Sequence, residues 1–153
     1  MHKILFVCHG NICRSPMAEF LLKDMVKKLG VASEFEIASA ATSREEIGNP
    51  VHHGTRNKLA QYGISVAGKH AVQMTRRDYE YYDYIIAMDS NNLRNIDRII
   101  GADDQHKVSL LLDYAGRKGQ SIADPWYTGD FDLTYDDIAA GLEGLLKFLG
   151  YKG

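Results

Sequence analysis

The chain has 153 residues, of which 45% are hydrophobic and 25% are charged, and its formal net charge at pH 7 is -2. This size and composition are typical of one globular domain with a sizeable core, and we expect a single domain over residues 1–153. The charge balance provides no basic surface for nucleic acid or for an anionic membrane. The apolar run at residues 4–7 is too short for a signal peptide or a membrane span. Two cysteines are too few for a disulfide framework, so we expect a reduced, cytoplasmic protein.

Strand and helix patterns alternate along the first part of the chain. Residues 3–7 predict a short buried strand, and a helix follows, with Ser15 as its N-cap, Pro16 in its first turn and Gly30 at its end. The pattern then predicts a strand at 35–40 and a helix within 55–62. Thr75 and Asp78 form a capping-box pattern that opens a short helix before a third strand at 84–88.

The second part of the chain continues the alternation. Asp89 is expected to cap a helix that runs to about residue 100, and a weaker strand is expected at 107–110. A loop at 116–130 leads to a final helix, which Thr134 and Asp137 are expected to open. This order favours an α/β fold of three layers, in which helices cover both faces of a parallel sheet. Ligands bind beyond the carboxyl ends of the strands in such sheets, and the loop after the first strand lies there.

The loop between the first strand and the first helix carries the most informative motif. It consists of Cys8, His9, Gly10, Asn11, Ile12, Cys13, Arg14 and Ser15. A loop that enters a helix directs its backbone N–H groups at one spot beside the positive end of the helix dipole, and this spot suits a phosphate. The same field favours a thiolate, so Cys8 is the candidate nucleophile. Arg14 adds a planar fork that can bind two phosphate oxygens.

Displacing phosphate from an alcohol or a phenol also needs a proton donor. Asp124 is the candidate, and Pro125, Trp126 and Tyr127 follow it in the loop at 116–130. A carboxyl group that faces a phosphate dianion keeps its proton more readily, because like charges disfavour ionisation. The two aromatic residues could form walls around a phenyl ring, or they could simply pack the loop onto the core.

With these residues in place, the sequence closely resembles the low-molecular-weight protein tyrosine phosphatase family over essentially its whole length. The resemblance rests on the Cys8-x5-Arg14-Ser15-Pro16 loop, on Asn11, on the Asp124-Pro125 pair and on the segments 39–42 and 88–89. It implies a flavodoxin-like domain with a four-stranded parallel sheet, no cofactor, and tyrosine-phosphorylated protein substrates. We expect binding of phosphate or related oxyanions without a metal, because loop amides and Arg14 can balance the phosphoryl charge. We also expect a monomer.

The resemblance implies a role for each matching residue. Cys8 attacks phosphorus and forms a phosphocysteine, Arg14 binds the equatorial oxygens, and Asp124 protonates the leaving phenol and then activates water. Ser15 hydrogen-bonds the thiolate, and Asn11 holds the strained shape of the loop.

Three further positions in the loop are less constrained. The resemblance implies that Cys13 can form a reversible disulfide with Cys8, although it could equally be an inert neighbour. His9 occupies a variable position and could contact the substrate or face solvent. Gly10, Ile12 and Cys13 are expected to support phosphate binding through the loop.

Two positions bear on the substrate. Members of the family commonly have an aromatic residue in the loop after the second strand, where our alignment places Glu45. One wall of the crevice is therefore expected to be charged, which puts high affinity for ordinary aromatic substrates in question. Relatives that act on phosphoarginine tend to have threonine at the position of Ile12, so Ile12 together with Trp126 and Tyr127 favours phosphotyrosine.

Other functions remain open at this point. A phosphoarginine phosphatase or an arsenate reductase can share the fold, but arsenate reduction needs extra thiols and the chain has only Cys8 and Cys13. A phosphate-binding module with a dead site would be expected to lack the nucleophile or the acid. The pair His52-His53 has no further ligands nearby in sequence and does not predict a metal site. Residues 69 and 70 could lie near the loop, but they are not included in the predicted site.

Overall fold

The computed structural model describes residues 1–151, so the last two residues of the predicted domain, 152–153, lie outside the described range. The elements in chain order are β1 (His2–Cys8), α1 (Arg14–Lys28), η1 (Ala32–Glu34), β2 (Phe35–Ala41), α2 (His53–Ala60), α3 (Arg76–Tyr81), β3 (Tyr84–Ala87), α4 (Ser90–Ile100), β4 (Val108–Leu110), η2 (Leu111–Ala115), α5 (Pro125–Thr128) and α6 (Phe131–Phe148). Within residues 1–151, no helix combines the length and apolarity that crossing a membrane requires.

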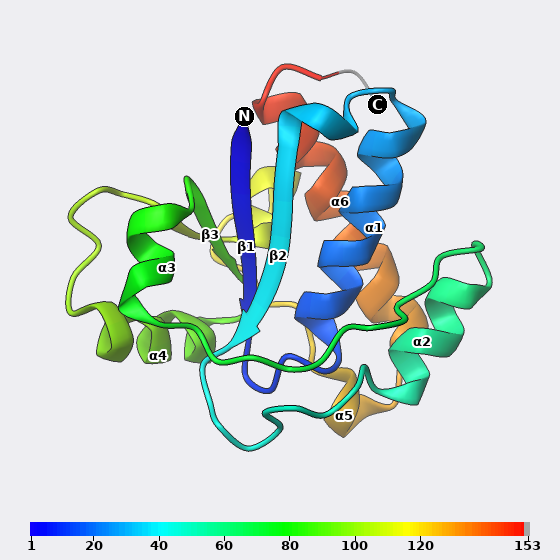
Figure 1. Cartoon of the computed structure of the whole chain (residues 1–153), viewed down its shortest axis with the longest axis horizontal. Coiled ribbons are helices and arrows are strands. Elements are labelled where there is room, and N and C mark those ends of the chain that lie inside the picture. Colours follow the sequence, from blue (N-terminus) through cyan, green and yellow to red (C-terminus); the bar gives the residue numbers. More distant parts are fainter. Residues whose placement is uncertain (152–153) are drawn as a thin grey trace.

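The four strands form one parallel sheet in the order β2-β1-β3-β4. β1 is central, and it pairs with β2 along its whole length, from His2 opposite Phe35 to Cys8 opposite Ala41. Helices α1 and α6 lie on one side of the sheet and α3 and α4 on the other (Figure 1). The predicted flavodoxin-like, three-layer α/β/α fold is therefore confirmed.

The side chains of β1 explain why its sequence is apolar without interruption. Ile4, Phe6 and Cys8 belong to the core cluster formed with α1 and α6. Leu5 and Val7 belong to the second cluster, which packs under α3 and α4. A strand that is buried on both faces shows no alternation of polar and apolar residues. Because side chains alternate between the two faces, the register of β1 places Cys8 on the face where α1 begins.

The start of α1 differs from the prediction. The helix begins at Arg14, the N-cap position is Cys13, and no side chain caps the helix. The predicted cap, Ser15, turns its hydroxyl away from the helix end, toward Cys8 and Asn11. Tertiary partners in the preceding loop therefore replace the local capping bond that the sequence pattern predicted.

The start of α6 also differs from the prediction. The helix begins at Phe131, and the carboxylate of Asp130 caps it. Thr134 and Asp137, which were predicted to open this helix, lie inside it. The hydroxyl of Thr134 donates to the carbonyl of Ala123 instead, and this bond ties α6 to the segment just before Asp124.

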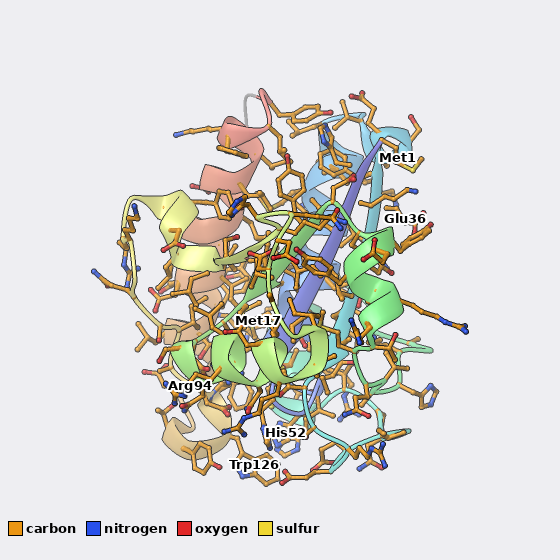
Figure 2. All side chains as sticks on the ribbon, turned by 90° about the vertical axis from the view of Figure 1, so that its left-hand side faces the viewer. Met1, Met17, Glu36, His52, Arg94 and Trp126 are labelled. Carbon is orange, nitrogen blue, oxygen red and sulfur yellow. The ribbon has the colours of Figure 1, made fainter. Side chains whose placement is uncertain are left out.

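The predicted loop at 116–130 contains a short helix, α5, which the sequence pattern did not predict. Its N-cap is Asp124, whose carboxylate accepts the N–H of Trp126, and Pro125 stands at its first position. α5 lies at the end of the sheet toward which β1 and β2 point (Figure 1). Figure 2 shows His52 and Trp126 together at this same end of the molecule, and their rings are 5.5 Å apart.

Candidate active site

Four backbone carbonyl groups in residues 8–13 point toward the surrounding chain. They accept hydrogen bonds from elsewhere in the chain: Cys8 from Thr42, His9 from Ser43, Ile12 from His52, and Cys13 from Thr55. The C=O and N–H of a trans peptide point in opposite directions, so the N–H groups that follow these carbonyls turn inward. Inward N–H groups at the start of a helix form a concave site for an anion.

Asn11 stabilises the strained turn in this loop. Its φ of 60° lies in the left-handed region, which asparagine tolerates better than most residues. The side-chain Oδ1 accepts the N–H of Val72 at 3.1 Å. The side-chain Nδ2 donates to Ser15 Oγ at 2.8 Å and to Ser39 Oγ at 2.9 Å. One amide thus ties the loop to α1, to β2 and to the segment after Gly68.

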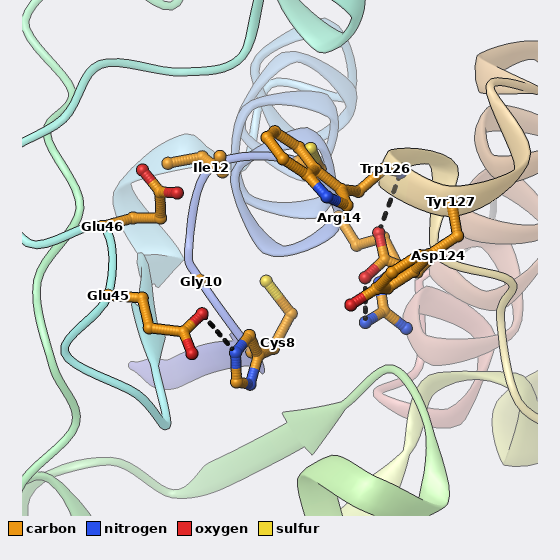
Figure 3. A pocket seen from close by; sticks show the side chains of 11 residues that line it. Cys8, Gly10, Ile12, Arg14, Glu45, Glu46, Asp124, Trp126 and Tyr127 are labelled. Carbon is orange, nitrogen blue, oxygen red and sulfur yellow. Dashed lines mark hydrogen bonds and ion pairs between the residues drawn. The ribbon is translucent and has the colours of Figure 1, made fainter.

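The sulfur of Cys8 lies at the centre of the loop. The backbone N–H of Asn11 points at Sγ from 3.3 Å, and Ser15 Oγ lies 3.0 Å away. Both groups can donate to a thiolate. Figure 3 shows the sulfur among the side chains that line an open pocket. The volume of this pocket is about 120 Å³. The lining residues are Cys8, His9, Gly10, Ile12, Cys13, Arg14, Glu45, Glu46, Asp124, Trp126 and Tyr127.

The pocket therefore brings together the predicted residues from three distant segments of the chain. Asn11 and Ser15 are the two predicted residues outside its lining, and both are buried behind the loop. Glu46 lines the pocket as well, although the sequence pattern did not single it out.

Arg14 is almost completely buried, with 2% of its surface exposed. Its Nη1 donates to Asp89 Oδ2 at 2.7 Å and to the carbonyl of Ile122 at 2.9 Å. Its Nη2 lies 3.4 Å from Asp124 Oδ2. Burial by itself lowers the pKa of the guanidinium, but the negative charges of Cys8, Asp89 and Asp124 outweigh burial and raise the pKa. Arg14 is consequently a fixed cation at the base of the pocket.

The two carboxylate oxygens of Asp124 have different partners, one in α5 and one in the pocket. Oδ1 accepts the N–H of Trp126 at 3.0 Å, and Oδ2 faces Arg14 (Figure 3). Trp126 and Tyr127 are 57% and 83% exposed, so they do not pack this segment onto the core. They form one side of the pocket mouth, opposite Glu45 and Glu46.

Cys13 is the second thiol in the pocket lining, and both cysteines are free. Burial, together with the nearby negative charges of Cys8 and Asp124, raises the pKa of Cys13 to about 12. Its thiol therefore stays protonated at neutral pH.

His52 and His53 pack as aromatic rings. Their ring centroids are 4.2 Å apart, and Phe131 stacks on the other side of His52 at 5.5 Å. The Nδ1 of His52 accepts the N–H of Gly54, so this side chain caps α2. Within the described part of the chain, no group of three or more His, Cys, Asp or Glu side chains could hold a metal ion.

Besides Glu46, two parts of the site were missed from the sequence. Asp89, predicted as a helix cap, does cap α4, and it also holds Arg14. The rule that parallel strands end at one edge would have predicted this contact, since Asp89 follows β3 and β3 is the neighbour of β1.

The second missed part is a buried polar chain behind the loop. Ser39 Oγ donates to Glu19 Oε1 at 2.5 Å, and Lys69 Nζ donates to the carbonyl of Ser39 at 2.9 Å. Burial lowers the pKa of Lys69, and the nearby carboxylate of Glu19 opposes that shift. Lys69 was left out of the predicted site because only the tertiary structure places it beside β2.

Comparisons with known proteins identify the family of the chain. Residues 3–152 match the family model described as low molecular weight phosphotyrosine protein phosphatase. The chain is 40% identical over 147 residues to the low molecular weight protein-tyrosine-phosphatase YfkJ of Bacillus subtilis, covering 95% of this chain and 94% of YfkJ. It is 41% identical over 149 residues to the low molecular weight phosphotyrosine protein phosphatase of Rattus norvegicus, covering 94% and 93% of the two chains.

Solved structures show the same similarity. The crystal structure of YfkJ superposes with a TM-score of 0.93 at 39% identity, over 97% of this chain and 94% of that one. The structure of a Drosophila arginine phosphatase superposes with a TM-score of 0.87 at 30% identity, over 99% of both chains. The family match over nearly the whole chain decides the assignment: this chain belongs to the low molecular weight phosphotyrosine protein phosphatase family.

Proposed function

We infer that this chain is a phosphatase that hydrolyses phosphotyrosine in proteins through a phosphocysteine at Cys8. The observation that carries this inference is the arrangement at one pocket: the sulfur of Cys8, at which the N–H of Asn11 points, lies in the same pocket as Arg14 and Asp124. The names of the similar proteins support phosphotyrosine as the substrate. The free thiols fit a reducing compartment, and we expect cytosolic phosphoproteins as substrates of a monomeric enzyme.

In the first step, the thiolate of Cys8 attacks phosphorus and an S–P bond forms. The bond from phosphorus to the phenolic oxygen breaks, and the carboxyl group of Asp124 gives its proton to that oxygen. The inward N–H groups of the loop and the guanidinium of Arg14 bind the three equatorial oxygens, where charge accumulates in the transition state.

In the second step, water attacks phosphorus while the carboxylate of Asp124 takes its proton. The S–P bond breaks, the thiolate of Cys8 is restored, and inorganic phosphate leaves. The N–H of Asn11 and the hydroxyl of Ser15 stabilise the departing thiolate through the two contacts at Sγ. Cys8 is thereby a leaving group as well as a nucleophile.

The two carboxylates on Arg14 have different roles in this scheme. Asp89 bonds Nη1 at 2.7 Å and keeps the guanidinium oriented. Asp124 contacts Nη2 at the longer distance of 3.4 Å, and a bound phosphate competes with it for that nitrogen. The first step requires Asp124 in its protonated form, and the second step requires its carboxylate.

Phosphoarginine is the alternative that the structural comparisons raise, through the Drosophila arginine phosphatase. Ile12 lines the pocket of this chain and has no hydroxyl to orient an attacking water. We therefore expect phosphotyrosine peptides to be hydrolysed faster than phosphoarginine peptides.

The nucleophile is tested with p-nitrophenyl phosphate in the presence of EDTA. The wild type should turn the substrate over, and Cys8→Ser should abolish steady turnover while vanadate still binds. Measurable steady turnover by Cys8→Ser would exclude the phosphocysteine.

The acid is tested by varying the leaving group. Asp124→Ala should slow aryl phosphates with basic leaving groups by about 10²–10⁴-fold, because a poor leaving group depends on the proton. It should slow the activated p-nitrophenyl ester much less. Equal losses on both kinds of ester would remove Asp124 from the acid role.

A further inference from the structure

The wall of the pocket opposite α5 is acidic. Glu45 and Glu46 line it, and both belong to the segment that follows β2. Figure 3 shows the two carboxylates on one side of the mouth, facing Trp126 and Tyr127 across Cys8. A phosphoester bound at Cys8 would therefore have acidic groups beside its aromatic ring and beside the residues that flank it.

Contacts within the pocket hold both carboxylates toward the mouth. Glu45 Oε2 lies 2.9 Å from His9 Nε2. The stem of Glu46 packs over Gly10, where an added Cβ would come within 3.3 Å of its Cγ. Asn49 donates its side-chain amide to Glu46 Oε2 at 2.5 Å. These contacts orient the two carboxylates, while the side chain of Glu45 stays 70% exposed and open to a bound substrate.

Glu46 keeps its negative charge uncompensated, because its hydrogen-bond partner Asn49 is neutral. Glu45 contacts the half-exposed ring of His9. Arg44, which precedes Glu45 in the sequence, directs its Nε to Gln73 at 3.2 Å. A carboxylate has about four lone-pair directions, and the contact with His9 uses only one of those on Glu45.

We propose that this acidic wall selects phosphotyrosine sites that carry lysine or arginine next to the phosphotyrosine. The proposal rests on the phosphatase function inferred above and names the class of substrate that this function serves. A cationic side chain beside the phosphotyrosine reaches Glu45 or Glu46 while the phosphate stays on Arg14. An aspartate or glutamate next to the phosphotyrosine would instead be repelled by the carboxylates of Glu45 and Glu46.

Two phosphotyrosine peptides of the same length test the proposal, one with lysines on both sides of the phosphotyrosine and one with glutamates. The ratio of kcat/KM, lysine peptide over glutamate peptide, should be about three- to tenfold at low salt, as expected for exposed ion pairs at one site. High salt should reduce this ratio, because exposed charges are screened.

Variants of Glu45 and Glu46 test whether the acidic wall causes the preference for the lysine peptide. Glu45→Gln and Glu46→Gln should each lower the ratio, and the double variant should bring it close to one. Glu45→Lys should invert the ratio, an outcome that lost packing could not produce. Glu143→Gln removes the same charge from the exposed surface of α6, outside the pocket, and should keep the wild-type ratio.

The outcomes separate this proposal from the function on which it rests. If the wild type hydrolyses neither peptide nor p-nitrophenyl phosphate, the proposed function fails. If it hydrolyses both peptides with equal kcat/KM at low salt, the proposed function stands and the selection of basic sites is refuted. A wild-type preference that survives in the double variant also refutes the role of Glu45 and Glu46. If a variant folds poorly, the kcat/KM ratio of the wild type and its dependence on salt still test whether basic sites are preferred.

Discussion

Replacing Asp89 should reveal how much the fold depends on holding Arg14. The carboxylate makes two bonds of 2.7 Å, one from the N–H of Asn92 at the start of α4 and one from Arg14 Nη1. Asp89→Ala removes both bonds. It leaves the guanidinium, which is 2% exposed, with the carbonyl of Ile122 and the weaker contact to Asp124.

The two losses can be estimated separately. A lost N-cap costs about 1 kcal/mol of unfolding free energy. Breaking a buried ion pair costs about 3–5 kcal/mol, and we take the lower end because Arg14 keeps two partners. The sum of about 4 kcal/mol corresponds to a fall of roughly 12 °C in the unfolding midpoint of a chain of this length. Asp89→Asn keeps a capping oxygen, so it should lose only about 3 kcal/mol.

Urea unfolding of the two variants and the wild type measures these differences. Asp97→Asn, an exposed position on the same helix, is the control and should stay within about 0.5 kcal/mol of the wild type. Both Asp89 variants should also lose up to about 100-fold in kcat/KM, because a misoriented Arg14 binds the phosphoryl group poorly. If Asp89→Asn unfolds with the wild-type free energy, the reasoning that Asp89 holds Arg14 is wrong.

Three further changes have defined outcomes. Iodoacetamide at neutral pH should modify Cys8 and spare Cys13, because the pKa of Cys13 is raised to about 12, as peptide mass spectrometry can measure. Burial and the neighbouring His53 lower the pKa of His52 below its ordinary value of 6.5, so the unfolded chain binds this proton first. The free energy of unfolding should therefore fall as the pH drops below about 6.5, and less steeply in His52→Asn, which keeps a capping side chain. Gly144→Ala should destabilise the fold by about 1–3 kcal/mol in urea although alanine favours helices, because its Cβ would overlap the backbone carbonyl of Tyr114.

Each of these three predictions has a result that would contradict it. Equal labelling of both cysteines would contradict the protonated state of Cys13, and added phosphate serves as the control because it should protect Cys8. Parallel pH profiles for the wild type and His52→Asn would show that another group causes the loss. An unchanged or raised stability of Gly144→Ala would mean that α6 can move away from η2 without cost.

Much of the fold follows from local patterns in the sequence. The apolar run at residues 3–7 predicted β1, and the capping residues Thr75 and Asp89 predicted α3 and α4. These predictions succeeded because an apolar run and a helix cap each involve only a few neighbouring residues. The wrong helix starts have one common cause. The hydroxyls of Ser15 and Thr134 bond to groups in the loop before each helix, and the capping patterns do not reveal such partners.

The sequence by itself predicted the candidate reactive centre, because a loop between a strand and a helix places Cys8 and Arg14 around one anion-binding spot within eight residues. The tertiary structure decided which distant groups complete that spot. The parallel sheet ends β1, β2 and β3 at one edge, and only this topology brings Asp89 and Asp124 to Arg14 and Glu45 to His9. Local chemistry thus determined the reaction, while the arrangement of charges around the pocket, which we propose selects the substrate, came from the packing of segments far apart in the chain.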